Sequence, residues 1–298
     1  MNRLLIILSR LFAALPRNAA ARLGSAMGFF VGRILRPRRG LILQTLAERL
    51  PETSPRERRR IVDGLYRGLA LNAVEILRIA GGKMAETVAE LDVTGEEHVQ
   101  KALAGGRGAL LLTAHLGNWD LLGMAAPRFG YPLTFISKNI KISGLNKFWM
   151  RIREEAGVRI LPPHNSYRDC LKVLRRNELL GFILDVNRPR SEAVFVDFFG
   201  IPAATTPGLA FLAAQSGAPV LPVFIRRTQS GRHEIRIHPA LPAPPDRSEA
   251  SIREATQHYT RAIEEEIRRR PEDWLWLHRR WKTRPDPDAP GQTTRRVS

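Results

Sequence analysis

The chain has 298 residues, enough for one large domain or for one domain with an appended element. Lys and Arg number 47 against 29 acidic residues, and the formal charge of +18 implies a polyanionic partner: nucleic acid, an anionic membrane surface or a phosphorylated substrate. The single cysteine, Cys170, excludes an internal disulfide framework and is typical of a reducing compartment.

The first 36 residues contain two apolar runs, at 4–15 and 23–35, that are interrupted by arginines. Neither run reaches the roughly 20 uninterrupted apolar residues that a membrane-spanning helix needs. Aliphatic side chains mixed with arginine are typical of a helix that lies among lipid headgroups, with its cations against anionic lipid. We therefore expect residues 1–36 to form an N-terminal interfacial helical anchor. The alternative is an amphipathic helix packed on the protein's own body.

Residues 37–284 are predicted to form the main domain, and residues 285–298, with three prolines and a glycine, a disordered tail. A helix is predicted over 52–80, followed by strands at 109–114, 133–137, 158–161, 179–185, 220–226 and 234–238. Helices are predicted at 119–129, 144–156, 167–177, 207–215 and 252–269. Strands that alternate with helices predict an α/β fold with helices on both faces of a sheet. Ligands bind such sheets beyond the carboxyl ends of strands, where His115 and Asp185 fall.

The most informative motif is His115-Leu-Gly-Asn-Trp-Asp120, directly after the first predicted strand. A spacing of five puts two side chains about 140° apart on a regular helix. The two can meet if His115 ends the strand and Asp120 opens a helix capped by Asn118, where the helix dipole favours an ionised carboxylate. This layout predicts an imidazole general base oriented by Asp120. The alternative is a structural histidine followed by a helix-start carboxylate.

Other catalytic patterns are missing from the sequence. No Gly-x-Ser-x-Gly elbow occurs, and Gly105-Gly-Arg-Gly108 lacks the lysine and the spacing of a phosphate-binding loop. The histidines show no paired metal-ligand spacing, and the basic residues lack the aromatic motif of an RNA-recognition sheet. We expect no metal, no cofactor and no nucleic-acid partner.

Four segments resemble the bacterial lipid A biosynthesis acyltransferases, the late or secondary acyltransferases of that pathway, within the HxxxxD glycerolipid-type acyltransferase superfamily. They occur in the family's order and span roughly residues 5–284. The Phe-Ile-Asp-Arg and Glu-Gly-Thr-Arg motifs of glycerophosphate acyltransferases are not present, which argues against a simple glycerolipid acceptor. The four segments are the 115–120 motif, Leu184-Asp-Val-Asn187, the run from Val194 to Gly208, and the run from Arg270 to Lys282.

The resemblance implies a mixed, largely parallel central sheet flanked by helices, as in glycerolipid acyltransferases. It implies acyl transfer from a thioester of acyl carrier protein or coenzyme A to a hydroxyl of a membrane glycolipid, a lipid A precursor above all. His115 would deprotonate that hydroxyl, at the cytoplasmic face of a bacterial inner membrane where the protein is peripheral or monotopic. Two alternatives remain. One is another lipid acceptor (a lysophospholipid, a phosphoinositide mannoside or an aminolipid), and the other is a non-catalytic protein that binds anionic membranes or nucleic acid.

Ten further residues are predicted to contact substrate. Asp185 either orients a substrate hydroxyl or holds Arg188 or Arg190, and Arg159 is either an oxyanion or phosphate contact or a surface arginine at a strand edge. Residues 198–200 are expected to line the acyl or acceptor groove, and Thr205 either joins them or starts the next helix. The basic residues 278–280 either bind phosphate or carboxylate or belong to a terminal helix packed by its tryptophans. The set is Asn118, Arg159, Asp185, Phe198, Phe199, Gly200, Thr205, His278, Arg279 and Arg280.

Overall fold

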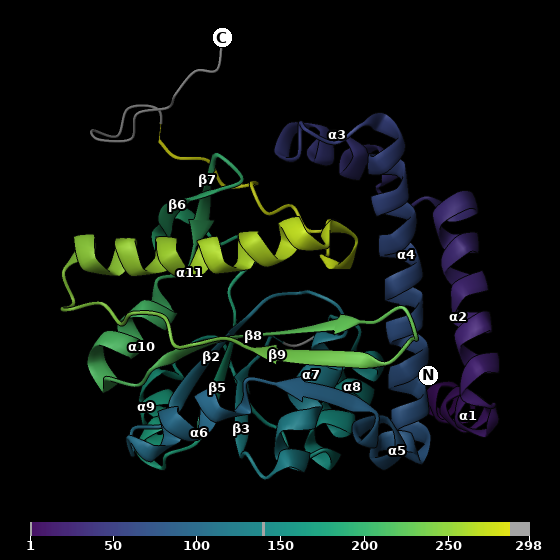
Figure 1. Ribbon diagram of the computed structural model, residues 1–298, viewed down its shortest axis with the longest axis horizontal. Helices are drawn as coiled ribbons and strands as arrows, with labels where there is room; N and C mark the ends of the chain where they lie inside the picture. Colours follow the sequence, from purple (N-terminus) through teal and green to yellow (C-terminus); the bar gives the residue numbers. More distant parts are fainter. Residues whose placement is uncertain (1, 139–140, 287–298) are drawn as a thin grey trace.

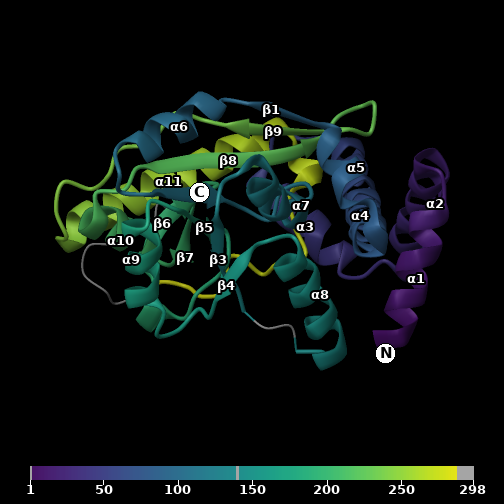
Figure 2. The same cartoon turned by 90° about the horizontal axis from the view of Figure 1, so that it is seen from below.

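The computed structural model describes residues 2–138 and 141–286. Seven strands within these ranges form one sheet, which lies between two layers of helices, and a helical N-terminal layer lies beyond one side (Figures 1 and 2). The strands follow the order β1 (Leu91–Thr94), β9 (His233–Ile237), β8 (Val220–Arg227), β2 (Ala109–Thr113), β5 (Leu179–Ile183), β3 (Leu133–Ile136) and β4 (Arg159–Leu161).

Most of these strands run in the same direction. The pairs β2–β8, β2–β5, β3–β5 and β3–β4 are parallel, whereas β8 and β9 are antiparallel, and β1 pairs in parallel with β9. The mixed, largely parallel sheet confirms the predicted fold class. All six predicted strands are present within one or two residues of the expected bounds, but β1 was not predicted.

The strands bury both faces, which is why they read as continuous apolar runs. In β2, Leu110 and Leu112 join one hydrophobic cluster and Leu111 joins the other. The first cluster includes side chains of α9 (Tyr167–Arg175), α10 (Gly208–Ser216) and α11 (Glu249–Arg269). The second includes side chains of α6 (Glu96–Ala104), α7 (Trp119–Ala125) and α8 (Ser143–Glu155).

A two-stranded hairpin, β6 (Val194–Phe198) with β7 (Ile201–Thr205), lies outside the main sheet and packs along α11. Its turn residues Phe199 and Gly200 both have positive φ, +57° and +73°, as a tight hairpin turn requires. The backbone N–H of Phe199 donates to Glu264 of α11. Sequence reasoning did not predict this hairpin. Thr205 ends β7 and does not start the next helix, which begins at Gly208.

The N-terminal layer consists of α1 (Asn2–Ala14), α2 (Arg17–Phe30) and a π-helical turn, Val31–Leu35. Next come α3 (Arg39–Arg49), α4 (Pro55–Arg78), a second π-helical turn (Ile79–Lys83) and α5 (Met84–Ala89). Figure 1 shows α2 alongside α4. The two backbones approach closely, since a Cβ atom at Gly28 would lie 2.6 Å from the Cα of Arg67.

One face of this layer therefore packs on the body of the protein, with Ala20, Gly24 and Gly28 buried. The other face leaves a row of large apolar side chains exposed. No helix in the described part of the chain has the length and hydropathy that crossing a bilayer requires. Most of the predicted tail, 285–298, lies outside the described residues. The exposed row is Leu4, Ile7, Leu11, Leu23, Met27, Phe29, Phe30, Ile34 and Leu35.

Candidate active site

The corner after β2 is built as the sequence predicts. Asn118 caps α7, because its Oδ1 accepts a hydrogen bond from the backbone N–H of Leu121. Gly117 has φ +55°, and its N–H donates to the carbonyl of Asp273 at 3.0 Å. Its own carbonyl accepts from Asn72 Nδ2 at 2.6 Å. The N–H and the carbonyl of Gly117 are therefore both held by residues far away in the sequence.

The register of the sheet brings His115 to Asp185. Thr113 pairs with Ile183 across β2 and β5, and each polar residue follows its strand by two positions. His115 Nδ1 lies 2.9 Å from Asp185 Oδ1, and the His115 backbone N–H donates to Oδ2 at 2.9 Å. Trp274 Nε1–H donates to the same Oδ2 at 2.7 Å. Asp185 thus accepts three hydrogen bonds within the described part of the chain. It does not hold Arg188 or Arg190, which pair with Glu192 and Asp286, and its contact with a substrate hydroxyl stays a prediction.

The electrostatics of this pair favour an ionised Asp185 next to the imidazole. Burial alone would raise the pKa of Asp185, but the charge of His115 and the hydrogen bonds from His115 and Trp274 lower it to about 2. Burial opposes a charged imidazole, yet Asp185 outweighs it and raises the pKa of His115 above 6.5, with a smaller contribution from Asp120. With Nδ1–H bound by Asp185, Nε2 is the nitrogen that can take a proton.

The predicted hydrogen bond between Asp120 and His115 is wrong. Asp120 Oδ1 accepts from Arg153 Nε at 3.0 Å and from Arg153 Nη2 at 2.6 Å, so its partner is a guanidinium of α8. Arg153 Nη1 also donates to Ser137 Oγ at 3.2 Å. Asp120 therefore lies near the imidazole without orienting it, and sequence reasoning did not find Arg153.

Two aromatic rings flank the imidazole. The ring of His278 stacks on His115 with a centroid distance of 5.2 Å and an interplanar angle of 25°. The ring of Trp119 contacts the His115 ring edge-on, with the two ring centroids 5.1 Å apart. Burial, together with the charge on His115, lowers the pKa of His278. The side chain of His115 remains 18% exposed, so the predicted base is not sealed from solvent.

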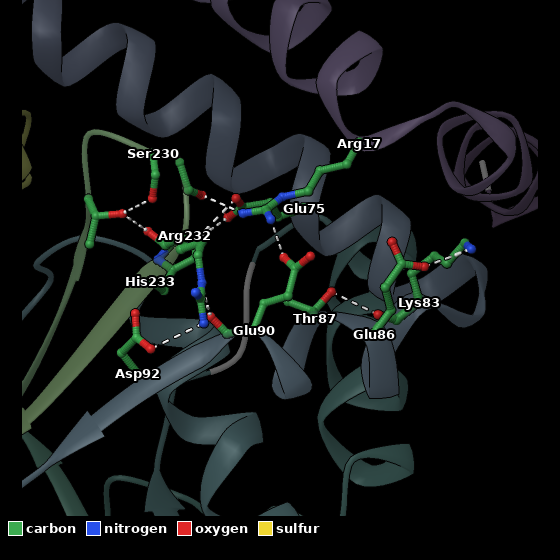
Figure 3. A network of polar contacts seen from close by, with 12 residues as sticks. Arg17, Glu75, Lys83, Glu86, Thr87, Glu90, Asp92, Ser230, Arg232 and His233 are labelled. Atoms are coloured by element: carbon green, nitrogen blue, oxygen red, sulfur yellow. Dashed lines mark hydrogen bonds and ion pairs between the residues drawn. The ribbon is translucent and has the colours of Figure 1, made fainter.

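A buried charged network supports the corner from behind. Asn118 Nδ2 donates to Glu75 Oε2 at 2.8 Å, and Glu75 also binds Arg227. Figure 3 shows Glu75 beside His233, with which it forms an ion pair. Burial would raise the pKa of Glu75, but the hydrogen bonds and charges of His233 and Arg227 lower it below its ordinary value. Figure 3 also shows Arg17 of α2 reaching Glu90, so the same region ties α2 to the body. Asn118 is 2% exposed and has a supporting place, not the predicted contact with substrate.

Several other predicted contact residues belong to the core. Arg280 is fully buried, donates to the carbonyl of Ala204 and to Thr205 Oγ1, and therefore holds the hairpin. Burial lowers the pKa of Arg280 to about 10. Phe198 and Phe199 are buried among three tryptophans, so they do not line a groove. Gly200 is exposed at the hairpin turn, where its N–H donates to Asp197.

The tryptophans of the C-terminal segment are buried as well, which agrees with the predicted alternative that they pack this segment on the protein. Trp274, Trp276 and Trp281 are at most 8% exposed. The segment does not form the terminal helix of that alternative, because among the described residues after α11, up to 286, the only helical turn is the 3-10 turn Pro271–Asp273. His278 and Arg279 are exposed, and their contact with substrate stays a prediction.

Arg159 lies away from this site. It begins β4, so it stands at the amino end of a parallel strand, whereas His115 and Asp185 follow carboxyl ends. Its guanidinium forms an ion pair with Glu178, the residue directly before β5, at the same amino-terminal end of the strands. Arg159 is therefore a surface arginine at a strand edge, as the alternative predicted, and it does not reach an oxyanion beside His115; a contact with phosphate stays a prediction.

Two cavities lie along α7. One, of about 30 Å³, is lined by Trp119, Asp120 and Arg153. The other, of about 60 Å³, is apolar and lies between the sheet and α6 and α7. Phe135 of β3 lines both, and Gly123 and Gly181 make room for its ring, which a Cβ atom at either position would meet at less than 3 Å. Phe135 thus separates an apolar cavity from the polar groups near His115.

Comparisons with known proteins identify the family of the chain. The family model for bacterial lipid A biosynthesis acyltransferases matches residues 2–283. A lipid A biosynthesis acyltransferase of Haemophilus influenzae is 26% identical over 93% of this chain and 86% of its own length. The lipid A biosynthesis lauroyltransferase of Escherichia coli is 27% identical over 93% and 89%. A phosphatidylinositol mannoside acyltransferase of Mycobacterium tuberculosis is 29% identical over 70% and 66%. The chain therefore belongs to the bacterial lipid A biosynthesis acyltransferase family and is an O-acyltransferase.

Proposed function

We propose that this chain transfers a fatty acyl group from an acyl thioester to a hydroxyl of a membrane glycolipid, with His115 as the general base. The observation that carries the proposal is the bond between His115 Nδ1 and buried Asp185, which leaves Nε2 to act. The names of the family and of the Haemophilus and Escherichia relatives favour a lipid A precursor as the acceptor.

In this mechanism Asp185 keeps the Nδ1–H tautomer and stabilises the imidazolium that forms. Nε2 takes the proton of the acceptor hydroxyl while the hydroxyl oxygen attacks the carbonyl carbon of the thioester. The tetrahedral intermediate then expels the thiolate, which takes the proton back from Nε2 and leaves as a thiol. General-base catalysis of this kind contributes about 10²–10⁴-fold in rate.

Arg153 and Asp120 occupy the wall next to the base. Their ion pair places a guanidinium beside the reaction centre, where it can offset the negative charge of the oxyanion. Asp120 then acts by holding Arg153, since its carboxylate makes no hydrogen bond to His115.

The apolar cavity behind Phe135 suits the acyl chain. Its lining is almost wholly hydrocarbon, as burial of a fatty chain requires. The chain would pass Trp119 and displace the Phe135 ring to enter it.

The exposed apolar row on α1, α2 and the following turn supports peripheral attachment to a membrane. We place the enzyme on the cytoplasmic face of the bacterial inner membrane. Its charge of +18 suits both an anionic lipid surface and an acidic donor such as acyl carrier protein, with acyl coenzyme A as the other donor.

A second acceptor class has an observation in its favour. Mycobacterial phosphatidylinositol mannoside acyltransferases are 29–30% identical to this chain, slightly more than the lipid A enzymes, although over less of its length. A mannosylated phosphoinositide is therefore the alternative acceptor.

The test is acyl transfer by the purified chain, with labelled acyl carrier protein or coenzyme A thioesters and each acceptor in turn. Mass spectrometry identifies the product. Transfer to a lipid A precursor, lost by at least about 10²-fold in His115→Ala, supports the proposal. Normal turnover by a folded His115→Ala protein would rule out this mechanism.

A further inference from the structure

A further hollow lies against α4, and neither His115 nor Asp185 lines it. Its volume is about 510 Å³. Its floor is a face of α4, and its walls are the β8–β9 loop and the segment that follows α11. We call it the arginine hollow; it is lined by Arg60, Gly64, Arg67, Gly68, Arg227, Thr228, Gln229, Arg270, Glu272 and Asp273, with Ile61 and Leu71.

Two of its four arginines are already neutralised. Arg227 is bound by Glu75, and Arg270 lies 3.0 Å from Asp273 and 3.5 Å from Glu272. Arg60 and Arg67 form no hydrogen bond or ion pair with any described residue, and both are exposed. Neither guanidinium is therefore held by a direct contact within the described residues, and the charge of Arg60 only helps to lower the pKa of the exposed Glu57.

These two arginines share one side of α4. Seven residues are about 20° short of two full turns, so both side chains leave the helix in nearly the same direction, about 10 Å apart along its axis. On that side of the helix, Gly64 lies between the two arginines and Gly68 lies next to Arg67. A Cβ atom at Gly68 would meet no atom within 4 Å, so the space above it is open. Two long guanidinium side chains thus overlook an open floor, which suits a compact anion such as a phosphate group.

The hollow continues toward the exposed apolar row. An adjoining cavity of about 340 Å³ runs between α2 and α4, shares Arg60, Gly64 and Arg67, and reaches Phe29 and Arg33. Phe29 is 66% exposed and belongs to that row. An anion in the hollow with an apolar tail would therefore have its tail beside side chains that suit a lipid surface.

We infer that the arginine hollow binds the phosphate-bearing headgroup of a membrane lipid. The site goes beyond the proposed acyl transfer, because binding there requires neither a thioester nor His115. The phosphate belongs either to a bulk anionic phospholipid or to the acceptor, and the vesicles used in the test separate these two sources.

The experiment measures binding of the full-length His115→Ala protein to vesicles, so that no turnover occurs. One set of vesicles is neutral, one contains phosphatidylglycerol, and one contains a phosphorylated lipid A precursor in neutral lipid. In this background Arg60→Gln with Arg67→Gln removes the free cations. Gly68→Leu fills the floor without changing charge, in a helix that tolerates leucine.

The matched control is Arg253→Gln with Arg261→Gln, which removes two exposed arginines from α11, outside the hollow. We expect the hollow variants to bind at least about tenfold more weakly to vesicles that carry the phosphate, and the control to lose less than about threefold. A loss on phosphatidylglycerol supports bulk lipid as the source, and a loss only on the lipid A precursor supports the acceptor.

Equal losses in the control and the hollow variants, or full binding by Gly68→Leu, would overturn the inference in favour of diffuse surface attraction. The inference would also be overturned if the hollow variants bound vesicles normally and lost only the binding of acyl carrier protein in solution. Because binding is measured without the reaction, its failure is distinct from failure of the proposed catalysis.

Discussion

Asp185→Asn tests how the imidazole is positioned. The substitution keeps the size of the side chain but removes the charge that raises the pKa of His115. Burial, which lowers that pKa, then prevails. We expect the acid limb of kcat/KM to move to lower pH while kcat falls by about 10²–10⁴-fold, because an imidazolium without its carboxylate is a poor intermediate.

The same carboxylate has a calculable effect on stability. Its pKa of about 2 lies below the ordinary 3.8, and a difference close to two units corresponds to roughly 2–3 kcal/mol. Since the folded pKa is depressed, this stabilisation is present above pH 4 and is lost as the pH falls toward 2. The raised pKa of His115 acts in the opposite sense, because its contribution is present at low pH and is lost as the pH rises through that pKa.

The assay is kcat/KM against pH, together with urea unfolding between pH 2 and 6. Arg153→Gln is the contrasting variant, because it removes a cation that lowers the pKa of His115 and should move the acid limb to higher pH. An unshifted acid limb in Asp185→Asn would refute the reasoning, as would additive losses of kcat in the His115→Ala, Asp185→Asn double variant.

Three further predictions follow. Glu75→Gln leaves Arg227, whose side chain is only 16% exposed, without its charge partner and should lower the free energy of unfolding by up to about 3 kcal/mol; an unchanged urea midpoint contradicts this. Phe135→Ala opens the apolar cavity and should shift competition between thioesters toward longer chains, whereas an identical chain-length profile contradicts it. Phe30→Asp with Ile34→Asp should weaken vesicle flotation about tenfold, with exposed Phe211→Asp as the unaffected control; equal flotation contradicts it.

The fold could be predicted from local pattern because its strands are buried on both faces and bounded by polar turns. Five-residue strands at 109–113 and 179–183 stand out as apolar runs, and each is followed by a polar residue two positions later. The pairing of His115 with Asp185 depends on β2 and β5 being neighbours in register. That adjacency is a tertiary fact, and the sequence signalled only that both residues follow the carboxyl ends of predicted strands.

Other contacts left no local signal. Arg153 lies 33 residues from Asp120, and Trp274 lies 89 residues from Asp185. The motif spacing favoured the nearer acid as the partner of His115, although the chain brings a more distant one closer. Residues 278–280 resembled a site for phosphate or carboxylate for the same reason, because composition does not reveal that Arg280 and Trp274 are fully buried.

The two carboxylates near His115 affect its pKa in different ways. Asp185 is buried with three donors and favours the imidazolium that forms when the hydroxyl is deprotonated. Asp120 also raises the pKa of His115, whereas Arg153, which binds the carboxylate of Asp120, lowers the pKa of His115. An unpaired Asp120 would keep the base protonated to higher pH and so reduce its availability. The Asp120–Arg153 pair therefore allows a second carboxylate beside the base without the full rise in pKa, and it adds a cation where an oxyanion would form.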